Sequence, residues 1–308
     1  MTRPTIVPFA DEHLEGAARL LAERHARHRA AEALLPAEVD FAAEIEKERE
    51  ELPGVVALEG DEVVGYLVGK RREDHVGPHV WSFIAGHAAR EPELTRDLYA
   101  AVAGDWVDAG VTRHFAYVPY LPDLIDPWFR LSFGASAVLA ARETAPEPPV
   151  DAGIVLREST PDDVRAAAEL ERAMQESMVP APSFGWTQPD EKATIVDEWA
   201  DTWDQSETYR HFVAERDGEI VGHILLYRRP VDLRVPADSI DLAQASTRPS
   251  LRGTGVGLAL THHVLRWAYE QEIPTMITDW RMTNMFASRF WPRRGFRPTF
   301  LRVYRSIP

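Results

Sequence analysis

The feature that most constrains the fold of this chain is an internal repeat, because its two halves follow one pattern. Residues 55–69, VVALEGDEVVGYLVG, alternate apolar side chains around a Gly-Asp pair, and residues 212–227, FVAERDGEIVGHILLY, do so around an Asp-Gly pair. Both stretches are typical of a β-hairpin. Further on, the pattern W-x-R-x-x-F occurs at residues 128–133 and again at residues 291–296. A long repeat that occurs once indicates duplication of a whole domain.

A proline-rich segment separates the two halves. Pro146, Pro148 and Pro149 lie close together, and proline lacks a backbone donor and disfavours helix before it, so this segment is expected to be a stiff, extended linker. We therefore expect domains at residues 1–145 and 154–308, joined by residues 146–153. Each half begins with a short apolar strand and an acid-rich helix start, and strands and helices then mix, which predicts an α/β fold.

The composition is that of a globular protein and excludes several classes. The chain is 45% hydrophobic and 27% charged, which is ordinary for folded domains. Its most apolar uncharged stretch, residues 131–141, is shorter than the ~20 residues that a membrane-spanning helix needs. Because no secretion signal is recognisable, we expect a cytoplasmic protein without membrane partners. The absence of cysteine excludes disulfides, thiolate metal sites and a cysteine nucleophile.

The distribution of charge points to one anion site. The net charge of −15 argues against nucleic-acid binding. Residues 248–308, however, carry ten arginines and three acids, which favours a local site for an anion. The alternative is a solvated, arginine-rich surface. His25-x-x-His28 lacks further ligands and is expected on a solvated helix face, so we expect no metal.

Residues 240–268 predict a strand, a glycine loop and a helix in succession. Gly253, Gly255 and Gly257 stand at alternate positions between an apolar strand and a helix whose apolar residues mostly follow helical spacing. Glycine lets a ligand approach the backbone, and the free amides at a helix start bind phosphate. Arg252 adds a fork of donors suited to a phosphate oxygen.

The spacing in this loop distinguishes between phosphate motifs. A Walker loop needs a lysine that is missing here, and the dinucleotide fingerprint needs a different glycine spacing. The remaining pattern, R-x-x-G-x-G at Arg252, Gly255 and Gly257, resembles the pyrophosphate-binding loop of the GNAT superfamily of acyl-CoA-dependent N-acetyltransferases. The alternative for the loop is a structural turn into a buried helix.

A second block, residues 284–296, resembles the closing signature of the same family. It contains Asn284, then Ala287, an aromatic pair at Phe290 and Trp291, and a final Gly-Phe pair. The resemblance implies a tandem of GNAT-like domains, each with a mixed, mostly antiparallel sheet flanked by helices. The first half has Glu-Pro-Glu at residues 91–93 where phosphate would bind, so it is expected to be a degenerate copy without cofactor.

The resemblance also implies the activity and the cofactor contacts. An acetyl group would move from acetyl-CoA directly to the amine of a small, cationic molecule, without a covalent enzyme intermediate. Main-chain groups of Ala245, Ser246 and Thr247 would contact pantetheine and the thioester, and Asn284 would bind pantetheine or cap the following helix. The loop would hold the pyrophosphate through Arg252, Gly253, Thr254, Gly255, Val256 and Gly257.

Two residues are candidates for the base that removes a proton from the amine. Asp241 lies six residues before Thr247, so strict alternation places both side chains on one strand face. His223 lies on the second strand of the hairpin. A salt bridge for Asp241 and a packing role for His223 are the alternatives. Many relatives have tyrosine where this chain has Trp291, and an indole is not an acid that protonates a departing thiolate.

The acceptor is expected to bind near residues 179–204, where aromatic and acidic side chains mix. Phe184, Trp186, Trp199 and Trp203 lie among several acids that include Asp190 and Asp204, a mixture that suits a cation, although Trp199 and Trp203 have the spacing of core residues. The alternative to an enzyme is a non-catalytic acyl-CoA-binding or regulatory module. The sequence leaves open whether the protein forms a homodimer.

Overall fold

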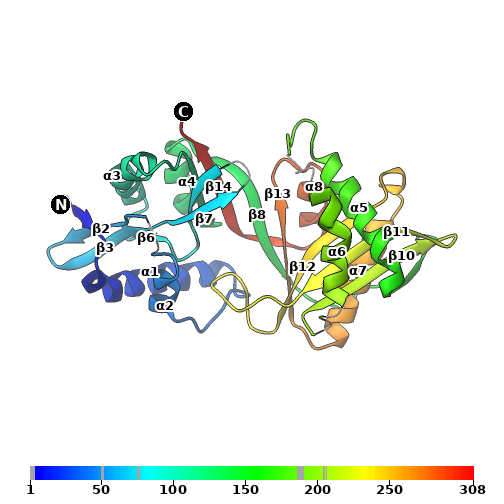
Figure 1. Ribbon diagram of the computed structural model, residues 1–308. Helices are drawn as coiled ribbons and strands as arrows, with labels where there is room; N and C mark the ends of the chain where they lie inside the picture. Colours follow the sequence, from blue (N-terminus) through cyan, green and yellow to red (C-terminus); the bar gives the residue numbers. More distant parts are fainter. Residues whose placement is uncertain (1–3, 50–51, 75–76, 186–190, 204, 206) are drawn as a thin grey trace. The chain divides into compact units, whose positions relative to one another are not determined.

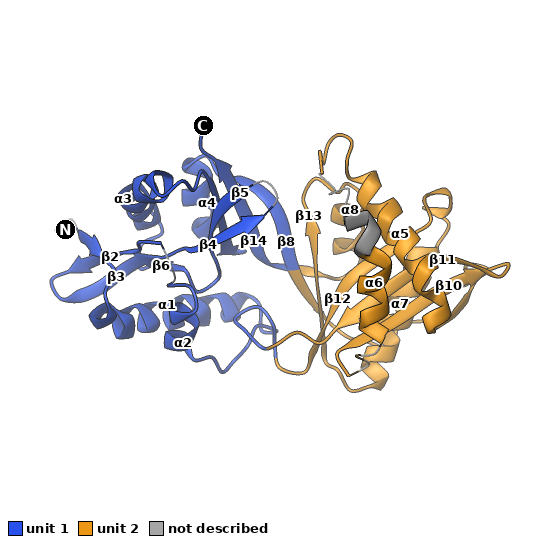
Figure 2. Cartoon of the chain, in the orientation of Figure 1, with its two compact units in different colours: residues 1–139, 231–236, 298–308 blue, residues 140–230, 237–297 orange. Residues whose placement is uncertain are grey.

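The computed structural model describes residues 4–49, 52–74, 77–185, 191–203, 205 and 207–308 (Figure 1). The chain forms two compact units, coloured separately in Figure 2. Unit 1 comprises Met1–Leu139, Val231–Pro236 and Pro298–Pro308, and unit 2 comprises Ala140–Pro230 and Ala237–Arg297. These units differ from the contiguous stretches 1–145 and 154–308 expected from the sequence, because the end of the chain lies in unit 1.

Unit 1 contains two groups of strands and four α-helices. The first sheet has the order β1-β2-β3-β6, and the second group has the order β4-β5-β7-β14-β8. The strands are β1 (Thr5–Pro8), β2 (Val55–Glu59), β3 (Glu62–Leu67), β4 (Lys70–Asp74), β5 (Gly77–Ser82), β6 (His87–Ala89), β7 (Arg113–Pro119), β8 (Gly134–Glu143) and β14 (Arg297–Ser306). The helices are η1 (Asp11–His13), α1 (Leu14–Ala31), α2 (Phe41–Glu46), α3 (Leu94–Asp108) and α4 (Pro122–Arg130).

The last strand of the chain completes unit 1. β14 pairs antiparallel with β7, from Phe300 opposite Pro119 to Ser306 opposite Arg113. Phe300, Leu301 and Val303 are buried there. This pairing is the reason that the compact units are not contiguous in sequence.

Unit 2 contains one mixed sheet with helices on both faces. Strands β9 to β12 pair antiparallel, β12 and β13 pair parallel, and the end of β8 from Ala140 belongs to this unit. The strands are β9 (Val155–Glu158), β10 (Tyr209–Arg216), β11 (Glu219–Tyr227), β12 (Ser239–Thr247) and β13 (Thr275–Arg281). The helices are η2 (Pro161–Asp163), α5 (Val164–Ser177), α6 (Glu191–Trp203), η3 (Pro249–Leu251), α7 (Val256–Glu270), α8 (Ala287–Phe290) and η4 (Pro292–Arg294).

Alternation along β11 shows which helices cover which face. A Cβ on Gly222 would lie 2.9 Å from Leu260 of α7, whereas Leu225, of the opposite parity, packs with α5 and α6. The two faces are called the α7 face and the α5/α6 face below. The predicted mixed, mostly antiparallel sheets flanked by helices are confirmed.

The repeat extends to backbone irregularities. In the β2–β3 hairpin the register shifts between Ala57 and Leu58, and in the β10–β11 hairpin it shifts at the corresponding place, between Ala214 and Glu215. Trp128 and Trp291, at matching positions, each pack edge-on against the phenylalanine five residues later, with ring centroids 5.0 and 5.4 Å apart. The same bulge and the same aromatic pair in both halves support duplication of one fold.

The proline-rich segment is held along unit 2 by polar contacts. Pro148 O lies 2.9 Å from His262 Nδ1, and Arg266 donates to Glu147 O at 3.3 Å. Both side chains come from α7, and Arg142 also bonds the Glu147 carboxylate at 2.7 Å. The segment that separates the two sequence halves is thus bound to the helix that follows the glycine loop.

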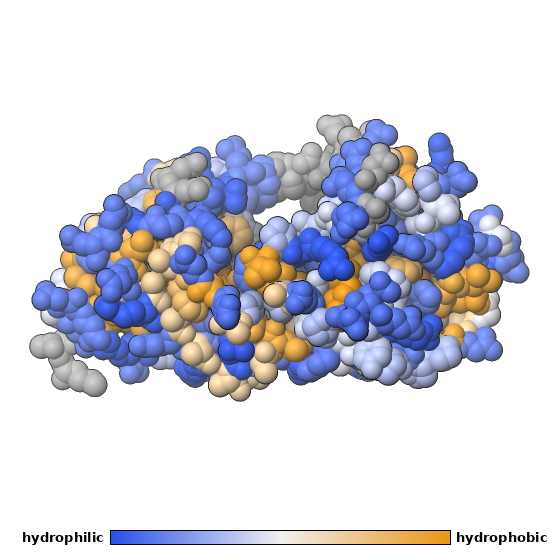
Figure 3. Space-filling model, turned by 90° about the horizontal axis from the view of Figure 1, so that it is seen from below, coloured by the Kyte–Doolittle hydropathy of each residue, from blue (hydrophilic) through white to orange (hydrophobic). Residues whose placement is uncertain are grey.

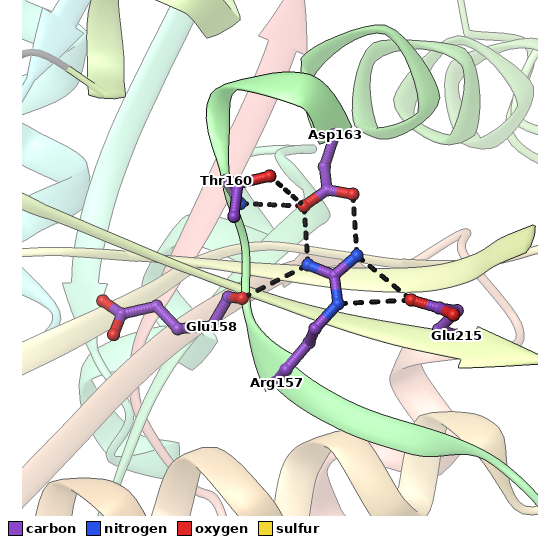
Figure 4. A network of polar contacts seen from close by, with 5 residues as sticks. All are labelled: Arg157, Glu158, Thr160, Asp163 and Glu215. Atoms are coloured by element: carbon purple, nitrogen blue, oxygen red, sulfur yellow. Dashed lines mark hydrogen bonds and ion pairs between the residues drawn. The ribbon is translucent and has the colours of Figure 1, made fainter. Parts of the chain in front are cut away.

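A polar network fixes the start of α5 on the sheet (Figure 4). The Arg157 guanidinium on β9 donates to both Asp163 carboxylate oxygens, at 2.7 and 2.9 Å, and to Glu215 of β10 at 3.2 Å. Asp163 also accepts from Thr160 N at 2.8 Å, which closes the helix start. This network sets the position of α5, whose far end reaches the cavity described below.

Figure 3 shows one face of the molecule, and hydrophilic residues cover most of it. They surround separate apolar areas. Within the described ranges, no helix has the length and apolar character that crossing a bilayer requires.

Candidate active site

Two parallel strands of unit 2 separate and leave a gap. β12 and β13 pair from Ser239 with Thr275 to Leu242 with Thr278, and the pairing ends there although both strands continue. A cavity of about 430 Å³ is lined by the stretch of β12 beyond this point, Ala245 to Thr247, and by residues of α5, α7 and α8. The main chain of this stretch is therefore not paired with β13.

A bulge in β12 lies where the strands part. Leu226 pairs with Leu242 but Leu225 pairs with Gln244, so Ala243 is an extra residue. Such an insertion reverses the alternation of side chains beyond it. Ser246 and Gln244 consequently lie on the α5/α6 face, while Thr247 lies on the α7 face with Gly222.

The glycine loop has the geometry that the sequence predicts. Gly253 has φ of +81° and Gly255 has φ of +95°, values that a side chain would strain. α7 begins at Val256, so its first amides have no partner within the helix. A Cβ on Gly257 would lie 3.4 Å from Thr247 Oγ1. The loop thus approaches β12 closely and directs a helix N-terminus at the cavity.

Arginines lie on aromatic rings at the cavity. The Arg252 guanidinium lies 4.9 Å from the Phe286 ring centroid and 3.4 Å from Ser177 Oγ. Arg294 lies 4.0 Å from the Phe290 ring, and burial together with Arg293 lowers its pKa. Both arginines and both phenylalanines line the cavity. Sequence reasoning singled out Arg252 but not Phe286 or Arg294, although the arginine-rich C-terminal block indicated an anion site.

Asn284 lines the cavity and also caps a helix. Its Oδ1 accepts from Phe286 N at 3.2 Å and from Ala287 N at 3.1 Å, at the start of α8. Its Nδ2 lies 3.8 Å from Met178 Sδ. The capping alternative is therefore realised in the structure, and the amide nitrogen is the part of the side chain left for a ligand.

His223 is buried at the cavity without a hydrogen-bond partner. The side chain is 1% exposed, it lines the cavity, and neither ring nitrogen has a partner. The Trp199 ring packs edge-on against it at 4.8 Å. Burial, with a smaller contribution from His211, lowers the pKa of His223 to about 3. The imidazole is therefore neutral at physiological pH, and one of its ring nitrogens can accept a hydrogen bond.

Asp241 lies apart from the cavity. It is 3% exposed and forms an ion pair with Arg229. The expectation that Asp241 and Thr247 share a strand face is wrong, because the extra residue Ala243 lies between them. Asp241 is not among the residues that line the cavity.

Trp291 lines the cavity but acts in packing. It is buried, and its ring meets Phe290 edge-on at 4.9 Å and Phe296 at 5.4 Å. Trp199 and Trp203 also pack in a core cluster of unit 2, as their spacing predicts. Trp186, Asp190 and Asp204, expected near the acceptor, lie outside the described residues.

A buried carboxylate joins α5, α6 and β12, and sequence reasoning missed it. Glu171 Oε1 accepts from Gln244 Nε2 at 2.7 Å, and its Oε2 accepts from Trp199 Nε1. No sequence motif contains these three residues, since they come from distant segments. Trp199 in turn contacts His223. The Glu171 carboxylate and its two partners therefore lie next to the candidate base.

Unit 1 differs from unit 2 at the corresponding place. Arg24 is buried and donates to the carbonyl oxygens of Ile84 and His87, just before and within β6. α3 follows Glu93, whose carboxylate binds Arg96 and Arg130. Acids precede this helix where unit 2 has its glycine loop, and the lack of a cofactor in unit 1 stays a prediction.

The expectation of a solvated helix face at His25 and His28 is wrong. Both rings are buried, His25 Nε2 bonds Pro36 O at 2.8 Å, and His28 packs edge-on against Phe300 at 4.8 Å. Burial lowers the pKa of His28 to about 3. In the part of the chain that the structure describes, no group of three or more potential ligands forms a metal site.

Comparison with known proteins agrees with this geometry. The pattern of the Acetyltransferase (GNAT) family, which performs acyl-CoA-dependent acyl transfer, matches residues 171–296. A GCN5-related N-acetyltransferase from Sphaerobacter thermophilus superposes with a TM-score of 0.62 at 16% identity, over 99% of this chain and 96% of that one. A search of curated proteins gave no match.

A second solved structure has the same two-part plan. A tandem GNAT protein from the clavulanic acid biosynthesis pathway superposes with a TM-score of 0.54 at 16% identity, over 98% of both chains. The family match includes the glycine loop, the gap between β12 and β13, and the segment from Asn284 to Phe296. Residues 171–296 therefore match the pattern of the acetyltransferase (GNAT) family, and the chain as a whole has the fold of a tandem GNAT protein.

Proposed function

We propose that unit 2 transfers an acetyl group from acetyl-CoA directly to the amine of a small, cationic molecule. The observation that carries this proposal is the combination of three features at one cavity. These are the unpaired edge of β12, the glycine loop at the start of α7, and a buried neutral histidine without partners. Each supplies one requirement of the reaction: a site for the thioester, a site for phosphate and a proton acceptor.

The cofactor is proposed to lie along the gap between the two strands. The amides at the start of α7 bind the pyrophosphate, since a helix N-terminus with glycines favours negative charge. Arg252 adds donors to the same phosphate oxygens. Main-chain groups from Ala245 to Thr247 contact pantetheine and polarise the thioester carbonyl, which stabilises the oxyanion of the tetrahedral intermediate. The amide nitrogen of Asn284 is placed to contact the pantetheine arm.

The proposed chemistry is a direct attack by the amine. The nitrogen lone pair forms a bond to the thioester carbon while an N–H proton passes to a ring nitrogen of His223. Collapse of the intermediate breaks the C–S bond and releases the CoA thiolate, which takes a proton from water because the indole of Trp291 is not an acid. The hydroxide so formed takes the proton from His223 and restores the neutral base. The products are the acetylated amine, CoA and the proton released from the ammonium.

The first test is titration of the protein with acetyl-CoA and with CoA by calorimetry. We expect one site per chain, in unit 2, and Arg252→Ala should weaken affinity about tenfold or more through the lost phosphate contact. Two sites would refute the assignment of unit 1 as a degenerate copy. Unchanged affinity in the variant would refute the assignment of the loop.

The second test identifies the base. His223→Gln and Asp241→Asn are compared in steady-state acetylation of an amine panel, with acetyl-CoA affinity measured for each. Loss of a general base lowers kcat by roughly 10²–10⁴, and we expect that loss for His223→Gln with acetyl-CoA affinity retained. A fall confined to Asp241→Asn would assign the role to the aspartate instead.

A non-catalytic acyl-CoA-binding module is the second candidate function. Trp291 favours it, because the residue cannot protonate the leaving thiolate. The two functions differ in one result: an acyl-CoA-binding module binds acetyl-CoA at one site but transfers the acetyl group to no amine.

A further inference from the structure

Buried polar atoms without partners gather on the α5/α6 face of β11 and β12. They are the two ring nitrogens of His223, Ser246 Oγ and Gln244 Oε1. The register places Ser246 directly opposite His223, and Gln244 follows two positions away on the same face. Side chains so related lie within about 5–7 Å at Cβ. His223 and Ser246 both line the cavity.

Such a gathering needs a physical explanation. Buried polar atoms in native proteins are nearly always hydrogen-bonded, and each one left without a partner costs roughly 1–3 kcal/mol. These four atoms belong to three neighbouring side chains, so a single bound group can reach all three. All three side chains accept hydrogen bonds: the Gln244 atom is a carbonyl oxygen, Ser246 offers a hydroxyl, and a neutral imidazole has one accepting nitrogen.

The hydrogen bond to Glu171 fixes the orientation of the Gln244 side-chain amide. A carboxylate only accepts hydrogen bonds, so the Gln244 amide directs its nitrogen at Glu171 Oε1, at 2.7 Å, and its carbonyl oxygen away. Gln175 Nε2 donates to the same oxygen at 3.2 Å, and Trp199 Nε1 donates to the other. The carboxylate is thus held by three neutral donors from α5, α6 and β12.

The charge of Glu171 has no counter-ion in this arrangement. The residue is 7% exposed, and within the described ranges no lysine, arginine or histidine forms an ion pair with it. His223 is neutral, as argued above. A buried charge without a partner is costly, so this face favours a ligand that brings a positive charge.

We propose that Gln244, Ser246 and His223 together bind the ammonium group of the acceptor, and that Glu171 is the positioning residue that orients Gln244 and supplies the negative charge. A primary ammonium has three N–H donors, which matches one acceptor from each side chain. The group is held next to the edge of β12 where the thioester is placed. The ammonium releases one proton to solvent, and His223 takes the second proton as the amine attacks. This inference rests on the proposed function and names its acceptor subsite.

One consequence is discrimination at the nitrogen. An N-methyl amine presents one N–H fewer and leaves one of the three acceptors unpartnered beside a methyl group. At roughly 1–3 kcal/mol for a buried unpartnered atom, the secondary amine should have a kcat/KM about 5- to 150-fold below that of its primary counterpart.

The experiment measures acetylation of n-butylamine, 1,4-diaminobutane and 2-phenylethylamine, each beside its N-methyl counterpart, by the full chain. The variants are Glu171→Gln, Gln244→Leu and Ser246→Ala. Glu176→Gln, an exposed glutamate on the same helix, and Gln205→Leu, an exposed glutamine after α6, are the matched controls. The amine KM, kcat, acetyl-CoA affinity and melting temperature are determined for each.

We expect the amine KM to rise at least tenfold in Glu171→Gln and Gln244→Leu, with acetyl-CoA affinity unchanged and both controls like the wild type. Ser246→Ala removes only a hydroxyl, so it still tests the subsite if the other two variants fail to fold, and its amine KM should rise several-fold. A purely structural Glu171 would lower the melting temperature without separating the amine KM from acetyl-CoA affinity.

The outcomes separate this inference from the proposed function. If primary and N-methyl amines are acetylated equally well, or if the variants retain the wild-type amine KM, the subsite is refuted while acetyl transfer stands. If the wild-type chain binds acetyl-CoA and acetylates none of these amines, the proposed function fails and the subsite fails with it.

Discussion

At the scale of single residues, charge is buried in unit 2 in two different ways. Arg157, Asp163 and Glu215 form a closed network of opposite charges (Figure 4). Glu171 has only neutral donors around it. In the Arg157 network the opposite charges neutralise one another, and the network stabilises the fold. The negative charge of Glu171 is neutralised only when a cation binds from outside. Partners, rather than burial alone, thus distinguish a structural carboxylate from a candidate binding residue.

The Asp163 network predicts a pH-dependent contribution to stability. Hydrogen bonds from Arg157 are the main reason that the pKa of Asp163 lies below its usual value, so its stabilising effect is present above the unfolded carboxyl pKa of ~4 and fades as pH falls through the lower folded pKa. Asp163→Asn should lower the free energy of unfolding by about 1–3 kcal/mol at pH 7. Urea unfolding from pH 7 to pH 2 measures this difference, and a constant difference down to pH 2 would contradict the assignment.

At the scale of elements, the bulge at Ala243 decides which side chains meet at the cavity. It places Ser246 and Gln244 beside His223 and leaves Asp241 with Arg229. Inserting one alanine after Ala243 should reverse the alternation once more, which moves either Asp241 or the cavity-lining stretch onto the wrong face. A carboxylate forced into the apolar α7 face costs several kcal/mol.

The insertion after Ala243 is therefore expected to lower the melting temperature and to abolish acetyl-CoA binding. Ala243→Ser keeps the strand length at this half-buried position and is the control. Calorimetric titration and thermal melting of both variants provide the test. Wild-type affinity in the insertion variant would show that the register of β12 does not set the site.

The glycine loop, the repeat and the second motif could be read from the sequence because each depends on neighbouring residues. Positive φ at Gly253 and Gly255 follows from local chain geometry, and the hairpins follow from alternation around a turn. The bulge at Ala243 could not be predicted, because nothing in IDLAQAST marks the extra residue. The error about Asp241 follows from it.

The burial of His25, His28 and Glu171 also could not be predicted from the sequence. A polar residue within a helix among charged neighbours favours a solvated face, and only tertiary packing overrides that preference. For His28 the packing partner is Phe300, 272 positions later in the chain. Glu171 meets Gln244 across 73 positions. No local pattern contains such pairs.

At the scale of the whole molecule, the compact units do not follow the duplication. Unit 1 needs β14 from the end of the chain, where Phe300, Leu301 and Val303 are buried. Each such side chain stabilises the fold by about 1.5–3 kcal/mol, which is a large part of the 5–15 kcal/mol by which a domain is stable.

A chain that ends after residue 297 should therefore unfold in unit 1 while unit 2 retains its site. We expect the truncated chain to bind acetyl-CoA at one site, to lose protection of unit 1 amides from hydrogen exchange, and to melt in a single step, that of unit 2. The full-length chain with Ser306→Ala, at an exposed position of β14, is the control. Native protection of unit 1 in the truncated chain would refute the requirement for β14.

The place of β14 also has a consequence during synthesis. Because its partner β7 is made some 180 residues earlier, a ribosome has released all of unit 2 before the first unit has its final strand. Until then β7 presents an open edge, the kind of surface that recruits other strands. Translation that stops before β14 would thus leave unit 1, although it is synthesised first, without its final strand and prone to aggregation, whereas unit 2 would have all its strands.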